Sequence, residues 1–149
     1  MTYASVVFDL LSVDTDLIAL VKVFAHRDVP NSGIDRETFP AAYDENGFML
    51  PFLVVRGRGD IPTNDVVDAE DQYVSVRSVV ELWFHADRDA GWDILEEAAD
   101  RCYVLLQYQQ IAGSFNCRLV NEIDEERQPD LGDACFARRD YEVIGFKAP

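Results

Sequence analysis

The residue types that most often perform catalysis or bind metals are scarce in this sequence. His26 and His85 are its only histidines. A catalytic triad needs a histidine beside a nucleophile, and a zinc site needs several ligands at close spacing. Neither histidine stands in such a pattern, and His85 continues the outward side of a predicted strand that also contains Trp83. We therefore expect His85 to be a surface or interface residue rather than a catalytic base.

The three cysteines, Cys102, Cys117 and Cys135, lie far apart and form no Cys-x-x-Cys pair. Their odd number and wide spacing indicate reduced thiols in a cytosolic setting rather than a disulfide framework or a zinc site. Cys102 falls on the apolar stripe of a predicted helix, and Cys117 shares a predicted strand face with Phe115 and Leu119. Because free cysteine is readily buried, we expect these thiols to pack in the core.

Two further motifs are explained by local structure. Residues 56–60 read Arg-Gly-Arg-Gly-Asp, which includes an adhesion tripeptide, but a glycine-rich turn after a strand accounts for them. They are not a phosphate loop either, because the Gly-Lys-Ser/Thr ending of that motif is missing. The adjacent acids Glu96 and Glu97 point in different directions on a helix, and residues 60–71 lack the ligand spacing of a calcium loop. We expect no enzyme, and neither a metal site nor a cofactor site.

The charge balance also limits the function. The chain has 28 acidic and 13 basic residues, which gives a formal net charge of −15. Nucleic-acid binding needs clustered Lys and Arg to displace counterions, so this charge argues against a site that grips nucleic acid, and equally against an anionic membrane surface. Residues 1–11 lack a basic start and no run of 18 apolar residues occurs, so we expect neither a signal peptide nor a membrane-spanning helix.

The pattern of apolar residues predicts the elements that must position any site. The length and the 48% hydrophobic content suit one domain, 1–149. Residues 3–23 predict a helix, a break and a second short helix, with a short strand at 23–26. A loop-like segment at 27–47 precedes a strand at 50–56, where Pro51 indicates an edge strand or the start of a strand.

The clearest pattern is an alternating strand at 73–85, which follows an acidic connection at 63–72. One side of this strand is mostly apolar and should face the core, whereas Val79 and Trp83 on the other side suit a face that another subunit partly covers. Asp87 or Asp89 can N-cap a long helix that runs to about Gln110 and covers the apolar side. Two strands, at 115–123 and 134–146, close the chain around a charged turn.

These elements predict an α+β fold. We expect a mostly antiparallel sheet of about four strands, packed on one face by the long helix and the N-terminal helix.

The order of the elements and a few motifs are similar to a known family. A Leu-Pro-Phe-Leu-Val-Val strand occupies residues 50–55, and the long alternating strand ends Glu-Leu-Trp-Phe-His at residues 81–85. A helix with spaced alanines and leucines follows at once, and two strands finish the chain. In these features, which cover most of its length, the sequence resembles the tail terminator proteins of long-tailed phages, also called tail completion or minor tail proteins.

The resemblance implies a structural protein of the virion, in its tail or neck, that is made in the host cytoplasm. Such a protein forms a ring, here expected to be a homo-hexamer, that caps the tail tube protein, ends its polymerisation and joins the tail to the head–tail connector or stopper protein. DNA passes through the pore as non-specific cargo, and no cofactor is implied. Electrostatic interactions are screened over roughly 8 Å at physiological salt. Acidic residues in a pore wall closer to the duplex than this would repel its phosphates and keep the DNA mobile.

Within this picture we assign residues to two surfaces. The segment at 60–71 has few apolar residues and is expected to be a mobile loop that orders against the tail tube or a neighbour. The subunit or tube interface is then expected to include Val79, Trp83, His85, Ile61, Asp65, Val66, Val67 and Asp68. The residues expected to line the acidic lumen are Glu70, Asp71, Asp124, Glu125 and Glu126.

Three alternatives remain open. A head–tail stopper or adaptor in the neck would share the ring and the acidic pore. A small ligand-binding domain or enzyme of bacterial origin would need a pocket with converging polar groups, for which the sequence offers no cluster. A small acidic adaptor could also act as a monomer.

Overall fold

The computed structural model describes residues 2–30, 34, 36–58, 61–68, 73–87, 91–111, 114, 116–128 and 134–147, of which 61–68, 73–76, 126–128 and 146–147 are described by their backbone. The helices in this part of the chain are α1 (Tyr3–Ser12), α2 (Thr15–Ile18) and α3 (Trp92–Leu106), with 3-10 turns η1 (His26–Asp28) and η2 (Pro40–Ala42). The strands are β1 (Lys22–Ala25), β2 (Phe52–Gly57), β3 (Ile61–Asp68), β4 (Tyr73–Ala86), β5 (Asn116–Gln128) and β6 (Ala134–Lys147).

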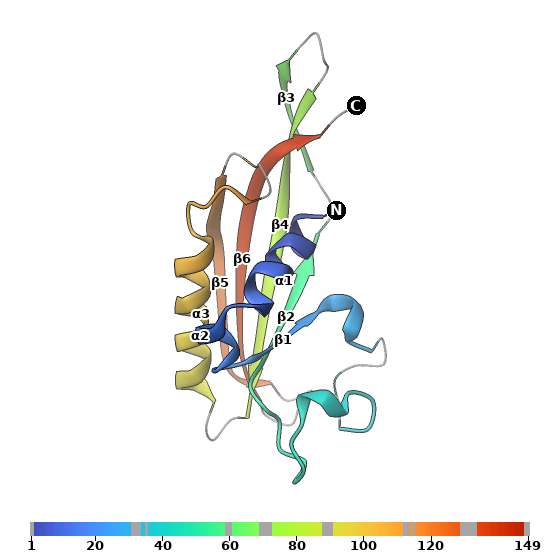
Figure 1. Ribbon diagram of the computed structural model, residues 1–149, viewed down its shortest axis with the longest axis vertical. Helices are drawn as coiled ribbons and strands as arrows, with labels where there is room; N and C mark the ends of the chain where they lie inside the picture. Colours follow the sequence, from blue (N-terminus) through green and yellow to red (C-terminus); the bar gives the residue numbers. More distant parts are fainter. Residues whose placement is uncertain are drawn as a thin grey trace.

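The strands form one mixed sheet in the order β1-β2-β4-β6-β5, and β3 pairs with the first part of β4 outside this row. The β1–β2 pair is parallel and the other pairs are antiparallel. Figure 1 shows β3 and the start of β4 projecting beyond the rest of the sheet. The expected α+β class with a mostly antiparallel sheet is confirmed, although the described residues form six strands rather than about four.

The helices cover one face of the sheet, as expected. α1 packs on β1, β2 and β4, and α3 packs on β4, β5 and β6 (Figure 1). The predicted alternation of β4 is confirmed, because Val80, Leu82 and Phe84 are buried in the core together with the apolar stripe of α3. That stripe consists of Leu95, Ala98, Ala99, Cys102 and Leu106. Among the described residues, no helix combines the length and apolar character that crossing a bilayer requires.

Three sequence-based boundaries need correction. The segment at 60–71 was expected to be a mobile loop, but Ile61–Asp68 forms β3. The acidic composition of this segment does not favour a strand, and pairing with β4 stabilises it through backbone hydrogen bonds. The charged turn expected from Asp124 onward is instead strand, since β5 continues to Gln128 opposite Ala134. Pro51 precedes β2, which lies between β1 and β4, so it marks a strand start and not an edge strand.

The ends of α3 also differ from the prediction. The helix starts at Trp92 with Gly91 as its N-cap and no side-chain cap, so Asp87 does not cap it, and Asp89 lies outside the described residues. A side chain at position 91 would meet the carbonyl oxygen of Asp87 and the Cβ of Ala86, which explains why glycine stands there. The helix ends at Leu106 rather than near Gln110.

All three cysteines are free and buried, which confirms that they are core thiols. Burial raises the pKa of Cys102 far above its usual range and raises the pKa of Cys117 to about 12. Since the thiolate is the reactive form, these two groups are unreactive at neutral pH.

A second apolar cluster covers part of the sheet face that lies opposite the helices. The segment between η1 and β2 places Phe39, Ala42 and Met49 over Phe52 and Val54 of β2. His85 is buried at the border of this cluster, where its ring stacks on that of Phe52 at 4.9 Å between ring centroids. The expectation of a surface histidine is therefore wrong for the single chain, because residues more than thirty positions earlier in the sequence cover this end of β4.

Asp14 links the short helix α2 to α3, and its pH response can be predicted. Its carboxylate accepts the Leu17 backbone N–H as an N-cap and forms two hydrogen bonds with Arg101, of 2.9 and 2.8 Å. The hydrogen bonds from Arg101 lower the pKa of Asp14 more than burial raises it. A lowered folded-state pKa stabilises the protein above the unfolded-state pKa of about 3.9, and this stabilisation is lost as the pH falls through the folded-state value.

We expect Asp14→Ala to lower the free energy of unfolding by about 1 kcal/mol at pH 7, mainly through loss of the cap. Asp14→Asn keeps a capping side chain and removes only the charge, so its deficit should be smaller and should fade below about pH 4. Urea denaturation at pH 7 and pH 3 measures both variants. A deficit of Asp14→Asn that grows toward acid pH would contradict this account.

Candidate functional site

The central part of the sheet face opposite the helices contains three buried carboxylates. Glu81 of β4 and Asp140 and Glu142 of β6 are 2%, 4% and 7% exposed. The register pairs Glu81 with Asp140, so two acidic side chains stand side by side across the two longest strands. A buried carboxylate is costly unless it is paired with a positive charge, so arginines are needed around them.

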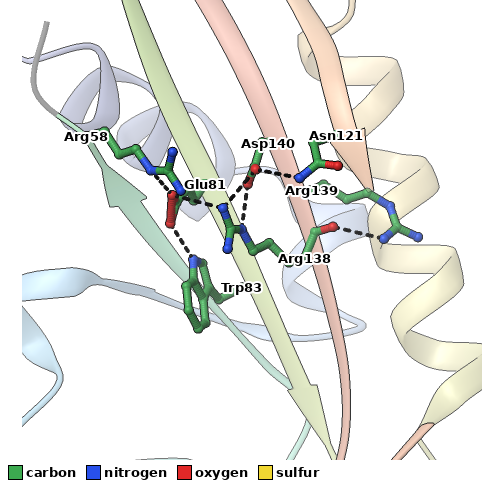
Figure 2. A network of polar contacts seen from close by, with 7 residues as sticks. All are labelled: Arg58, Glu81, Trp83, Asn121, Arg138, Arg139 and Asp140. Atoms are coloured by element: carbon green, nitrogen blue, oxygen red, sulfur yellow. Dashed lines mark hydrogen bonds and ion pairs between the residues drawn. The ribbon is translucent and has the colours of Figure 1, made fainter. Parts of the chain in front are cut away.

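Arg138 joins Glu81 to Asp140. Its guanidinium donates to both carboxylate oxygens of Asp140 at 2.8 and 2.9 Å, and to Glu81 at 3.3 Å. Figure 2 shows Arg138 between the two acids, with Asn121 of β5 donating to Asp140 from the other side. The hydrogen bonds to Asp140 raise the pKa of the Arg138 guanidinium, so the group remains charged. The arrangement holds three neighbouring strands together.

Trp83 and two further arginines complete the network around Glu81. Arg58 forms an ion pair with Glu81, and the indole N–H of Trp83 donates to the same carboxylate at 3.0 Å (Figure 2). The guanidinium carbons of Arg56 and Arg138 lie 5.5 and 5.3 Å from the centroid of the Trp83 ring, which is cation–π geometry. Trp83 is therefore held within the chain's own network.

Glu142 forms ion pairs with two arginines at the other end of this charged face. Arg77 of β4 lies 3.5 Å from it and Arg118 of β5 lies 3.4 Å from it. The face thus contains five arginines (Arg56, Arg58, Arg77, Arg118 and Arg138) and three buried carboxylates. The five arginines outnumber the three buried carboxylates, although the chain as a whole has a net charge of −15. Three of the arginine side chains are about half exposed, namely Arg58, Arg77 and Arg118.

The chemistry of this charged face is that of binding. Each guanidinium has five N–H donors, and the exposed arginines use only a few of them in ion pairs with the described residues. They can therefore donate to carboxylates or phosphates of another molecule. No group of three or more metal-ligating side chains that could hold an ion occurs among the described residues.

The residues predicted for the interface are brought together only in part. Val79 and Trp83 lie on the charged face and are partly buried, whereas His85 is covered by the neighbouring apolar cluster. The remaining five belong to β3, at the projecting end of the sheet (Figure 1): Ile61, Asp65, Val66, Val67 and Asp68.

The predicted lumen residues do not form one described cluster. Glu70 and Asp71 lie outside the described residues. Asp124 on β5 accepts a 2.6 Å hydrogen bond from Arg139, and Glu125 next to it is exposed. Glu126 belongs to β5 by its backbone.

The ion-pair network was not among the features expected from the sequence, although the sequence contains a signal for it. Arg138, Asp140 and Glu142 occupy every second position of β6, on the side away from the helices. Arg77 and Glu81 lie four positions apart on the same side of β4. Alternating charges of both signs on two adjacent strands indicate cross-strand ion pairs.

The fold is similar to that of a chain in a solved structure described as "Virion of native gene transfer agent (GTA) particle". The two chains share 15% sequence identity, the TM-score is 0.58, and the similarity covers 97% of this chain and 94% of the other. No protein-family model matches the sequence, and no curated protein matches it either. At this identity the similarity concerns the fold.

Proposed function

We propose that this chain is a structural protein of a phage-like virion and that it forms the ring that caps the tail tube. The observation that carries the proposal is the fold similarity to a chain of a gene transfer agent virion, which extends over nearly the full length of both chains. The sequence resemblance to tail terminator proteins gives the finer assignment. An assembly role also agrees with the half-exposed arginines of the charged face, Arg58, Arg77 and Arg118, which can donate to another protein.

The projecting β3–β4 hairpin supports a contact beyond the subunit itself. β3 pairs with β4 along one edge and extends past the end of the row β1-β2-β4-β6-β5 (Figure 1). An outlying strand of this kind offers backbone groups and side chains to another protein. We assign this hairpin to the contact with the end of the tail tube, where the apolar residues Val66 and Val67 would be covered.

The acidity of the chain supports a pore through which DNA moves. Each copy has a formal net charge of −15, and six copies in a ring would surround the duplex with negative charge. Within a screening length of roughly 8 Å such a wall repels phosphates and prevents tight binding. A basic lumen would bind the duplex and slow its passage.

Electron microscopy of particles produced without this chain tests the proposal. We expect tails of irregular and excessive length that are detached from heads, because the tube would not be capped. Resupplying the wild-type chain should restore tail length and attachment. Tails of normal length that are detached from heads would assign the chain to the head–tail stopper or adaptor instead, and tails of normal length on heads would overturn both assignments.

A further inference from the structure

The outer side of α3, which points away from the sheet, is acidic. Four exposed acids recur at spacings of three and four residues and therefore share this side of the helix: Asp93, Glu96, Glu97 and Asp100. We call these four residues the acidic row. The only base of α3 is Arg101, which pairs with Asp14 and Asp16. No member of the acidic row forms an ion pair with a base in the described part of the chain.

The arginines of the charged face have room for further acidic partners. Arg77 and Arg118 share the carboxylate of Glu142 at 3.5 and 3.4 Å, and both arginine side chains are about half exposed. Arg56 is exposed and contacts the ring of Trp83, and it forms no ion pair with a described acid. Guanidinium groups bind carboxylates through charge-assisted hydrogen bonds, and the rest of this chain is rich in carboxylates.

Both surfaces also contain apolar side chains that a partner could cover. Tyr103 and Val104 continue the outer side of α3 beyond the acidic row, and they are 44% and 63% exposed. On the charged face, Val79 and Ile144 are partly exposed beside the arginines. Subunit interfaces combine apolar contacts with polar and charged pairs, so the two surfaces are complementary in more than charge.

The acidic row and the charged face lie on opposite sides of the same strands. α3 packs on one face of β4, β5 and β6, whereas Arg77, Arg118 and Glu142 of these three strands lie on the other face. β4 and β5 are two strand spacings apart, which is about 10 Å. From Asp93 to Asp100 the acidic row is also about 10 Å long. One acidic row is therefore long enough to reach both Arg77 and Arg118.

We propose that the acidic row of α3 in one copy binds the exposed arginines on the charged face of the next copy. The contact joins two different surfaces on opposite sides of the subunit, so it repeats from copy to copy, and a suitable rotation between copies closes a ring. It brings opposite charges together on copies that otherwise repel each other through their net charge of −15. This inference rests on the ring of the proposed function and gives that ring its subunit contact.

Charge reversal in the acidic row tests one half of the contact. Glu97→Lys combined with Asp100→Lys changes two exposed side chains that have no ion pair with the described bases, so the fold should be retained. We expect self-association of the full-length chain to weaken at least tenfold in sedimentation experiments, because like charges would then face each other. Asp9→Lys combined with Glu45→Lys is the matched control, since both residues are exposed, lie outside the row and give the same change in net charge.

Removal of two exposed arginines tests the other half. In Arg58→Ala combined with Arg118→Ala, each buried carboxylate that loses a partner keeps a second arginine. These remaining arginines are Arg138 and Arg77. Self-association should again weaken at least tenfold. A mixture of this face variant with the row variant should form complexes of one copy of each and nothing larger, because only one intact row meets one intact face. A mixture that stays monomeric while the wild type assembles would overturn the contact.

The same variants in particles separate this contact from the proposed function. Rings that are lost with the row variant and kept with its control support the contact, even where the wild-type chain is a monomer in solution. If particles with the row variant contain intact rings, the contact is wrong while the proposed function stands. If the wild-type chain forms no ring in solution or in particles, both are wrong. A face variant that loses binding to duplex DNA or to another virion protein, but self-associates like the wild type, would also overturn the contact.

Discussion

Replacing Phe52 by alanine is expected to lower the free energy of unfolding by about 3–5 kcal/mol, the range for a fully buried phenylalanine. The Phe52 side chain is 0% exposed, and it lies at the centre of the apolar cluster opposite the helices. Its ring stacks on His85 and meets Phe24 and Phe39 at centroid distances of 6.0 and 6.2 Å. The alanine variant loses these contacts and leaves a cavity.

The loss should concentrate in the segment before β2. Phe39, Ala42 and Met49 are held on the sheet largely through Phe52 and Val54, so amide exchange at residues 36–50 should accelerate first. Chemical denaturation and hydrogen exchange measure the two effects. Phe48→Ala is the control from the same segment, because Phe48 is 60% exposed and should change stability by less than about 0.5 kcal/mol. Equal losses for Phe52→Ala and Phe48→Ala would show that this cluster does not hold the segment.

The elements that the sequence predicts well are those with one buried face. In β4 the apolar residues stand at alternate positions, and in α3 they recur at helical spacing, because each element packs on the other through a single side. The same physics explains why the predicted order of helices and strands agrees with the structure apart from β3. A periodic pattern indicates which side of an element is buried, whichever other element packs against that side.

The features that the sequence did not predict depend on residues far away along the chain. β3 contains Pro62 and several polar residues, so its strand conformation comes from pairing with β4 rather than from local preference. His85 follows Trp83 on the strand face away from the helices, and only the fold brings Phe52 and Phe136 against it. The register across β4 and β6 likewise decides which charges meet.

The Glu81 carboxylate has three partners in the ion-pair network, so Glu81→Ala is expected to be strongly destabilising. Glu81 is 2% exposed and contacts Arg58, Arg138 and Trp83. Its removal leaves Arg138, whose side chain is 17% exposed, with Asp140 as its remaining anion and with Arg58 close by. Because Arg138 keeps Asp140, we expect a loss of about 2–4 kcal/mol, below the upper end for a broken buried pair.

A double-mutant cycle shows whether this loss comes from the buried pair or from the exposed one. The Arg58 side chain is 56% exposed, so solvent screens its ion pair and its coupling with Glu81 should stay below about 1 kcal/mol. The coupling of Glu81 with Arg138 should exceed it, since both side chains are largely removed from water. Glu125→Ala is the exposed control and should be nearly neutral. Equal couplings for the two arginines would mean that the burial of the Glu81–Arg138 pair adds nothing to its strength, which would contradict this account.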